Sequence, residues 1–203
     1  MRMADLDGAR KYILGMLEKD LLANFYYHGL WHTKAVIKSV DELCNYYDLN
    51  EVDAMILRIA AAYHDSGFLH TYKDHEEEGC RIAEKKLPQF GYTEEEIAHI
   101  NRLIMATKVP QSPHSFLEEL ICDADLDYLG GHDYSRIAGL LYMEFQEYQI
   151  IQSENQWLNM QISFLEKHRF FSNYSGDKNN NGKLSNLNEV KQQLISYENQ
   201  NND

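Results

Sequence analysis

The sequence is poor in residues that interrupt helices, with only 3 Pro and 11 Gly among its 203 residues. Long stretches contain neither, which argues against a many-turned β-sandwich and favours helices. Its 3 Cys show no Cys-x-x-Cys spacing, so a disulfide scaffold is not expected. We interpret them as reduced thiols of a cytoplasmic protein. The length suits one domain with a full core.

Basic residues and long apolar runs are also scarce. With 19 Lys and Arg against 32 Asp and Glu, the net charge is −13. A chain this acidic repels phosphate backbones, so we expect no binding to duplex nucleic acid. The N-terminus lacks the apolar core of a signal peptide. No apolar run approaches the roughly 20 residues of a membrane span, so we expect no membrane partner.

Helical periodicity dominates the pattern of apolar residues and predicts an all-α protein. The predicted helices cover residues 4–22, 30–47, 51–65, 74–86, 93–108, 115–128, 133–152 and 154–171. Asn50 and Asp133 are predicted N-caps, and Thr93-Glu94-Glu95-Glu96 is a capping box. No strand pattern extends beyond a few residues.

The composition changes near residue 175, after which the chain is rich in Asn and has few apolar side chains. The sequence therefore predicts one domain over residues 1–174. Residues 175–203 are predicted to form a polar tail, with one short helix from Leu187 to Tyr197 as an option.

A small set of ionisable side chains falls on the apolar faces of the predicted helices. His32, His64 and Asp125 each lie four residues from an apolar position, and positions four apart share a helix face. Asp65 directly follows His64. A buried, unpaired carboxylate is costly. Two imidazoles and two carboxylates that meet at a divalent cation remove that cost together, and they suit Mn, Fe, Co, Ni, Zn or Mg. A hydrogen-bonded network without metal is the alternative.

Asp125 is flanked by two more aspartates, Asp123 and Asp127. Residues two apart are separated by about 200° around a helix. Asp125 falls within the predicted buried stripe, whereas Asp123 follows Glu119 by one turn, on the side expected to face water. Asp125 is therefore the predicted ligand of the three.

The ordered set of these residues resembles the ligand pattern of the HD superfamily of metal-dependent phosphohydrolases. The resemblance covers residues 25 to about 170, and the metal positions match His32, His64, Asp65 and Asp125. The segment Tyr27-His28-x-x-x-His32 is similar to one in cyclic nucleotide phosphodiesterases, which share this fold. The resemblance implies an HD-domain, phosphodiesterase-like helical bundle with one divalent metal ion. It also implies that His28 is the general acid.

Two further residues are candidates for contacts around the metal. His75 looks like an additional His of the binuclear HD phosphodiesterases, but a contact to a ligand, a contact to substrate phosphate and an ordinary helix-start position stay open. Where the next His pair of those enzymes should follow, this chain has Ala106-Thr107-Lys108, so we expect one metal. Lys108 is a candidate phosphate contact, although Lys is common at a helix C-terminus.

The sequence therefore predicts a metal-dependent hydrolase of a nucleotide or another small phosphate ester, either a monoester or a diester. Water bound to the metal would be the nucleophile. Asp65 or Asp125 would orient or deprotonate this water, and the predicted catalytic residues are His28 and Asp65. The chain lacks the Gly-Tyr-Pro signature of the cyclic-dinucleotide branch, and no particular nucleotide is predicted.

Two other functions stay open at this stage. One is an HD-fold oxygenase with two irons, which needs more ligands than the sequence offers. The other is a nucleotide-binding regulatory module that the metal only stabilises. A homodimer is also left open.

Overall fold

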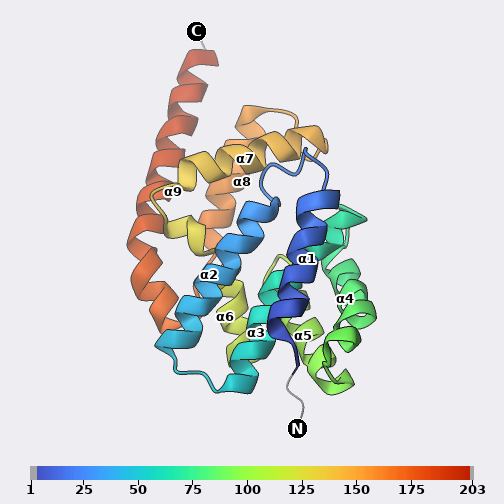
Figure 1. Ribbon diagram of the computed structural model, residues 1–203. Coiled ribbons are helices and arrows are strands. Elements are labelled where there is room, and N and C mark those ends of the chain that lie inside the picture. The colour runs from blue at the N-terminus through green and yellow to red at the C-terminus, as the bar shows by residue number, and fades with distance from the viewer. Residues whose placement is uncertain (1–3, 202–203) are drawn as a thin grey trace. The chain divides into compact units, whose positions relative to one another are not determined.

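The computed structural model describes residues 4–201, and Figure 1 shows them as helices joined by short connections. The regular elements in this range are all helical, which confirms the predicted all-α class. In the same range, no helix has the length and the hydropathy needed to cross a bilayer. The chain divides into two compact units, the first ending at Asp125 and the second beginning at Leu126. The predicted boundary after residue 174 therefore falls inside the second unit.

The first unit contains most of the predicted helices. They are α1 (Leu6–Asp20), α2 (Leu30–Tyr46), α3 (Glu51–Tyr63), α4 (His75–Lys86), α5 (Glu94–Ala106) and α6 (Phe116–Asp125), with the short 3-10 helices η1 (Ser66–Leu69) and η2 (Leu87–Phe90). The side chain of Asn50 caps α3, and the capping box of Thr93 and Glu96 begins α5. Both caps were predicted from the sequence.

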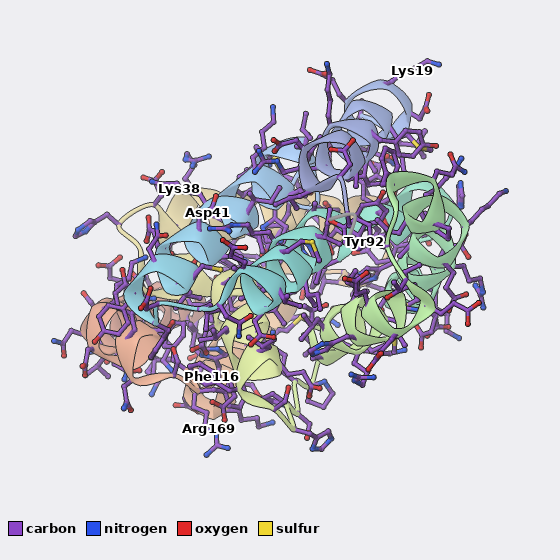
Figure 2. The ribbon with its side chains drawn as sticks, turned by 60° about the horizontal axis from the view of Figure 1, so that its bottom comes forward. Lys19, Lys38, Asp41, Tyr92, Phe116 and Arg169 are labelled. Carbon is purple, nitrogen blue, oxygen red and sulfur yellow. The ribbon has the colours of Figure 1, made fainter. Side chains whose placement is uncertain are left out.

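Helix α3 lies largely buried inside the first unit. It packs against α1, α2, α5 and α6, and residues 54–57 and 59–63 are all buried. Arg58, the one charged residue in this apolar stretch, donates from Nε to Asp41 Oδ1 on α2 at 2.6 Å. Figure 2 labels Asp41 on α2. Because α3 lies inside the unit, the residues that follow its C-terminal end are buried as well.

The second unit contains η3 (Asp127–Gly130), α7 (Tyr134–Glu147), α8 (Glu154–Lys167) and α9 (Asn173–Asn201). Trp157, Leu158 and Leu165 on α8 and Val190 on α9 are part of its apolar core. Asp133 lies at the N-cap position of α7, but its side chain accepts no capping hydrogen bond there. Helix α7 also ends at Glu147, earlier than the predicted residue 152.

The C-terminal segment differs from the predicted polar tail. Residues 173–201 form one continuous helix, which packs on α8 and η3. The buried Asn179 donates from Nδ2 to Asp127 Oδ1 at 2.7 Å, and the buried Asn186 donates from Nδ2 to the carbonyl oxygen of Leu129 at 2.8 Å. The prediction of a tail with only a short helix is therefore wrong, because hydrogen-bonded Asn side chains take part in the packing that apolar residues usually provide.

Candidate metal centre

The predicted metal ligands come from the ends of three helices of the first unit. His32 lies in the first turn of α2, His64 and Asp65 follow the last residue of α3, and Asp125 is the last residue of α6. Helices α2 and α6 both pack against α3 and against each other. His32, His64 and Asp65 are at most 4% exposed, and the side chain of Asp125 is 13% exposed. The fold therefore brings all four side chains together.

The four side chains present nitrogen and oxygen atoms at short, similar distances. His32 Nε2 lies 3.1 Å from Asp125 Oδ1 and 3.4 Å from His64 Nε2. His64 Nε2 lies 3.4 Å from Asp125 Oδ1. Asp65 Oδ2 lies 3.2 Å from His64 Nε2 and 3.5 Å from His32 Nε2. Ligands about 2.1 Å from one ion lie ~3.0–3.4 Å from one another in octahedral or tetrahedral geometry, so these spacings suit a shared cation.

The orientation of His64 is set by its own helix. Its Nδ1 lies 2.9 Å from the carbonyl oxygen of Ala61. Because a carbonyl oxygen can only accept a hydrogen bond, Nδ1 must carry the proton and donate it. In the neutral ring, Nε2 then carries the lone pair, and it faces His32 and Asp125. A hydrogen bond from the second ring nitrogen fixes the tautomer and the direction of metal-binding histidines in the same way.

One oxygen in the cluster tests directly whether a cation fits. Asp65 Oδ2 is buried and has no hydrogen-bond partner among residues 4–201, although an imidazole nitrogen lies near it. A buried carboxylate oxygen without a partner is costly. A divalent ion held by this oxygen and by the neighbouring Nε2 atoms would remove the cost, and His32, His64 and Asp125 alone already form a group that could hold an ion. The residues present therefore fit the predicted metal.

The carboxylates make the centre strongly attractive to positive charge. Burial opposes the charged form of His64, but Asp65 and Asp125 outweigh it and raise the pKa of His64 well above its usual value. Burial also opposes ionisation of Asp125, and the hydrogen bonds of His32 and His64 still lower the pKa of Asp125 to about 2. The pKa of Asp65 is held well below its usual range against the same burial, chiefly by His64. The same field favours a metal cation.

His28 and His75 lie beside this cluster and both pack on the ring of Phe68, with their own ring centroids 6.0 Å apart. His28 is half-buried in the loop before α2, with its ring centroid 4.3 Å from that of Phe68 and 6.1 Å from that of His32. His75, the first residue of α4, stacks on Phe68 at 3.9 Å and places Nε2 3.6 Å from Asp65 Oδ1. The sequence analysis did not single out Phe68, because one more apolar residue after a buried helix looks like ordinary core.

A glycine allows His75 to lie this close to Asp65. A Cβ atom on Gly67 in η1 would collide with the backbone carbonyl oxygen of His75. The two segments therefore touch backbone to backbone, and any side chain at this position would separate them.

Lys108 forms hydrogen bonds with two carboxylates at the start of α4. Its amine donates to Glu77 Oε1 at 2.6 Å and to Asp74 Oδ1 at 3.2 Å, and these bonds raise the pKa of Lys108. The predicted contact of Lys108 with a substrate phosphate stays a prediction.

The expectation that Asp123 faces water is wrong. Asp123 is fully buried, as are its neighbours Cys122 and Ala124, because α6 is covered on more than one side in the first unit. Asp127 lies beyond the end of α6, in η3 of the second unit, where it pairs with Lys178 at 3.1 Å. The three aspartates therefore do not divide into one buried and two solvated side chains.

No protein-family model and no curated protein matches the sequence. Among solved structures, the chain is similar to the crystal structure of a predicted HD superfamily hydrolase from an uncultured Thermotogales bacterium. The TM-score is 0.60 and the sequence identity is 20%, over 92% of each chain. At this identity the likeness is one of fold. The chain therefore shares the all-helical fold of that protein, which agrees with the fold that the resemblance of its ordered histidines and aspartates implies.

Proposed function

We propose that the protein is a divalent-metal-dependent phosphohydrolase acting on a nucleotide or another small phosphate ester. The observation that carries the proposal is the convergence of His32, His64, Asp65 and Asp125, with one buried oxygen of Asp65 lacking a hydrogen-bond partner within the described chain. The HD-type fold supports the same reading. When bound, a divalent ion supplies a Lewis acid for the phosphoryl oxygen and lowers the pKa of a bound water.

The residues of the centre have distinct roles in this proposal. His32, His64 and Asp125 would hold the ion. The two oxygens of Asp65 face different partners, because Oδ2 lies beside the two imidazoles and Oδ1 lies 3.6 Å from His75. Asp65 can therefore hold the ion and orient a water molecule, while His75 fixes the plane of its carboxylate.

His28 is the proposed general acid for the leaving oxygen. Its ring packs at 4.3 Å against Phe68 and at 4.6 Å, edge to face, against Tyr27, so its direction is restricted while one part stays accessible. Its ring centroid lies 6.1 Å from that of His32, and the group of side chains among residues 4–201 that could hold an ion consists of His32, His64 and Asp125. Such a position suits proton donation to a substrate that the metal holds.

Charge supports a small substrate over a polymer. The chain carries a net charge of −13, so a long polyanion would be repelled by most of its surface. A small phosphate ester needs only the local positive charge that the ion would provide.

The test is hydrolysis by the purified full chain after chelation and reloading with Mn, Fe, Co, Ni, Zn or Mg. The substrates are p-nitrophenyl phosphate, bis-p-nitrophenyl phosphate, nucleoside monophosphates and cyclic nucleotides. We expect at least one metal to restore hydrolysis, and the mono- and diester probes to show which bond is cleaved. Metal bound without hydrolysis of any probe would favour the regulatory module. Two irons per chain with oxygen consumption would favour the oxygenase.

A further inference from the structure

The second unit contains a cavity of about 160 Å³ among helices α7, α8 and α9. At ~30 Å³ for each water in the liquid, this is room for roughly five water molecules. Common ligand pockets measure ~300–1,000 Å³. The cavity therefore accepts a small molecule or a head group, and it is too small for a whole nucleotide.

Three of the thirteen residues that line the cavity are aromatic. Tyr134, Tyr142 and Trp157 all contribute, and the ring centroids of Tyr142 and Trp157 lie 5.7 Å apart with their planes inclined by 30°. The hydroxyl of Tyr134 donates to Gln161 Oε1 at 2.9 Å, and both residues are buried. Its ring is therefore fixed by a bond inside the protein. Faces of Trp and Tyr rings attract cations within about 6 Å of the ring centroid.

The charged groups of the lining are of one sign. Glu154 at the start of α8 and Glu189 on α9 line the cavity, and its lining includes no Lys, Arg or His. Neither carboxylate forms an ion pair with another residue of the described chain. Glu154 also suits the N-terminal turn of a helix, and Glu189 lies on an exposed side of α9. A cation is therefore favoured in the cavity and an anion is disfavoured.

The arrangement suits an organic cation better than a metal ion. Across residues 4–201, the group of side chains close enough to hold a metal is the one in the first unit, so the carboxylates of this cavity are not gathered in that way. An ammonium ion needs no such short contacts, because ring faces and nearby carboxylates attract it together. We propose that the cavity of the second unit binds a small organic ammonium ion. The inference does not depend on the proposed hydrolase activity, since none of its residues belongs to the metal centre.

The first test compares a cation with a neutral molecule of the same shape. Choline and 3,3-dimethylbutan-1-ol differ in charge but hardly in size, and each is titrated into the full chain by calorimetry. We expect choline to bind in the millimolar range or tighter and the alcohol to bind about tenfold more weakly. Added salt should weaken choline binding, because the carboxylates are exposed. A parallel titration with n-butylammonium shows whether a quaternary or a primary ammonium is preferred.

The second test removes the charge without changing the shape of the lining. Glu154→Gln combined with Glu189→Gln should weaken the binding of the preferred cation about tenfold. Glu147→Gln, an exposed site on α7 outside the cavity lining, is the matched control and should leave binding unchanged. Both glutamates of the double variant are exposed, so the fold should survive, and circular dichroism checks this.

Three outcomes would overturn the proposal. They are equal affinity for choline and its neutral isostere, no binding of either ammonium ion at millimolar concentration, and unchanged affinity in a folded double Gln variant. The readout is binding alone, so failure here leaves the hydrolase proposal intact.

Discussion

The two units differ in how their buried polar side chains are satisfied by hydrogen bonds. In the second unit, the amides of Asn179 and Asn186 find hydrogen-bond partners in Asp127 and in a backbone carbonyl, and together they hold α9 against η3. In the first unit, the buried side chains of His32, His64, Asp65 and Asp125 point toward one another. Among residues 4–201, Asp65 Oδ2 has no hydrogen-bond partner. Satisfied polar groups make a packing surface, whereas a buried carboxylate oxygen that lies beside two imidazole nitrogens suits a bound cation.

The buried polar groups of the two units also differ in charge. The polar groups of the packed interface are largely neutral amides, which need only a hydrogen bond. The cluster of the first unit contains two carboxylates, whose charge no neutral partner removes. Hydrolysis that depends on a metal ion bound in the first unit should therefore be sensitive to loss of a carboxylate there and insensitive to the same substitution at Asp127 in the second unit.

The sharpest test of this difference is one chemical change made two residues apart. Asp125→Asn removes the charge beside His32 and His64 and should abolish metal binding. Hydrolysis should fall by more than about 100-fold, since even residues that only orient ligands contribute about 10–100-fold. Asp127→Asn, in the second unit, should leave both unchanged. Elemental analysis and kcat measure the two effects, and similar losses in the two variants would remove the distinction between the units.

Within the first unit, His28→Ala separates catalysis from metal binding. General acids contribute about 10² to 10⁴-fold, so kcat should fall by that amount while the metal content stays the same. His70→Ala is the matched control, because His70 is a partly exposed histidine bonded to Glu78 at 2.7 Å. If His28→Ala loses the metal, His28 is a ligand and its proposed role as the acid is wrong.

The sequence predicted the first unit better than the second for a physical reason. Helical periodicity and caps such as those of Asn50 and Thr93 are local, and the structure has them where they were predicted. The convergence of His32, His64, Asp65 and Asp125 could be predicted because ionisable residues on apolar faces are rare, and their order along the chain resembles a known family. The role of His28 was not decided by spacing, since it depends on how a loop packs on Phe68.

The errors came from features whose cause is not local. Helix α9 is polar along most of its length, and the residues that stabilise it include Asp127 and Leu129, about 50 positions earlier. Composition alone therefore indicated a tail. Asp123 was placed at the surface by its position relative to Glu119, but the number of neighbours that cover α6 is a property of the whole unit.

Removing the metal should affect one unit more than the other. The chain has 2 Trp, of which Trp31 lies in α2 beside His32 and Trp157 lies in the core of the second unit. Chelation should lower the unfolding midpoint, by about 2–4 °C for each kcal/mol of metal-binding stabilisation. The shift should be larger in a Trp157→Phe variant, where Trp31 reports, than in a Trp31→Phe variant. Equal shifts would mean that the two units unfold as one.

A smaller effect on stability is expected when a methyl group is added where α9 and η3 touch. A Cβ atom on Gly182 would collide with the backbone carbonyl oxygen of Gly130, so Gly182→Ala should lower the free energy of unfolding by about 1–3 kcal/mol. Gly139→Ala, on α7 with no heavy atom within 4 Å of its Cβ position, should be neutral or slightly stabilising. Urea unfolding followed by Trp157 fluorescence measures both. Metal content should not change in either variant, and a loss of metal in Gly182→Ala would couple the second unit to the centre.

The smallest effect is expected at the exposed charges of the first unit, where Lys108 donates to Glu77 and Asp74. The hydrogen bond from Lys108 lowers the pKa of Glu77 from its usual 4.5. A carboxyl with a lowered pKa adds stability above that usual value and loses it as the pH falls through the lowered one. Lys108→Met should therefore be slightly less stable than the unchanged protein at neutral pH, and the difference should vanish in acid. The difference in stability should be small because the side chains of Lys108 and Glu77 are both more than a third exposed.

The variant Lys108→Met also tests whether Lys108 contacts the substrate. Because its amine is already bonded to two carboxylates, we expect KM of Lys108→Met to stay unchanged. Lys85→Met, an exposed lysine in the last turn of α4, is the matched control for the loss of one positive charge. Urea unfolding at neutral and acid pH gives the stability, and initial rates on the best phosphate ester give KM. A rise in KM for Lys108→Met, absent in Lys85→Met, would show that the amine leaves Glu77 to bind the phosphate, and the metal centre would then extend to the end of α5.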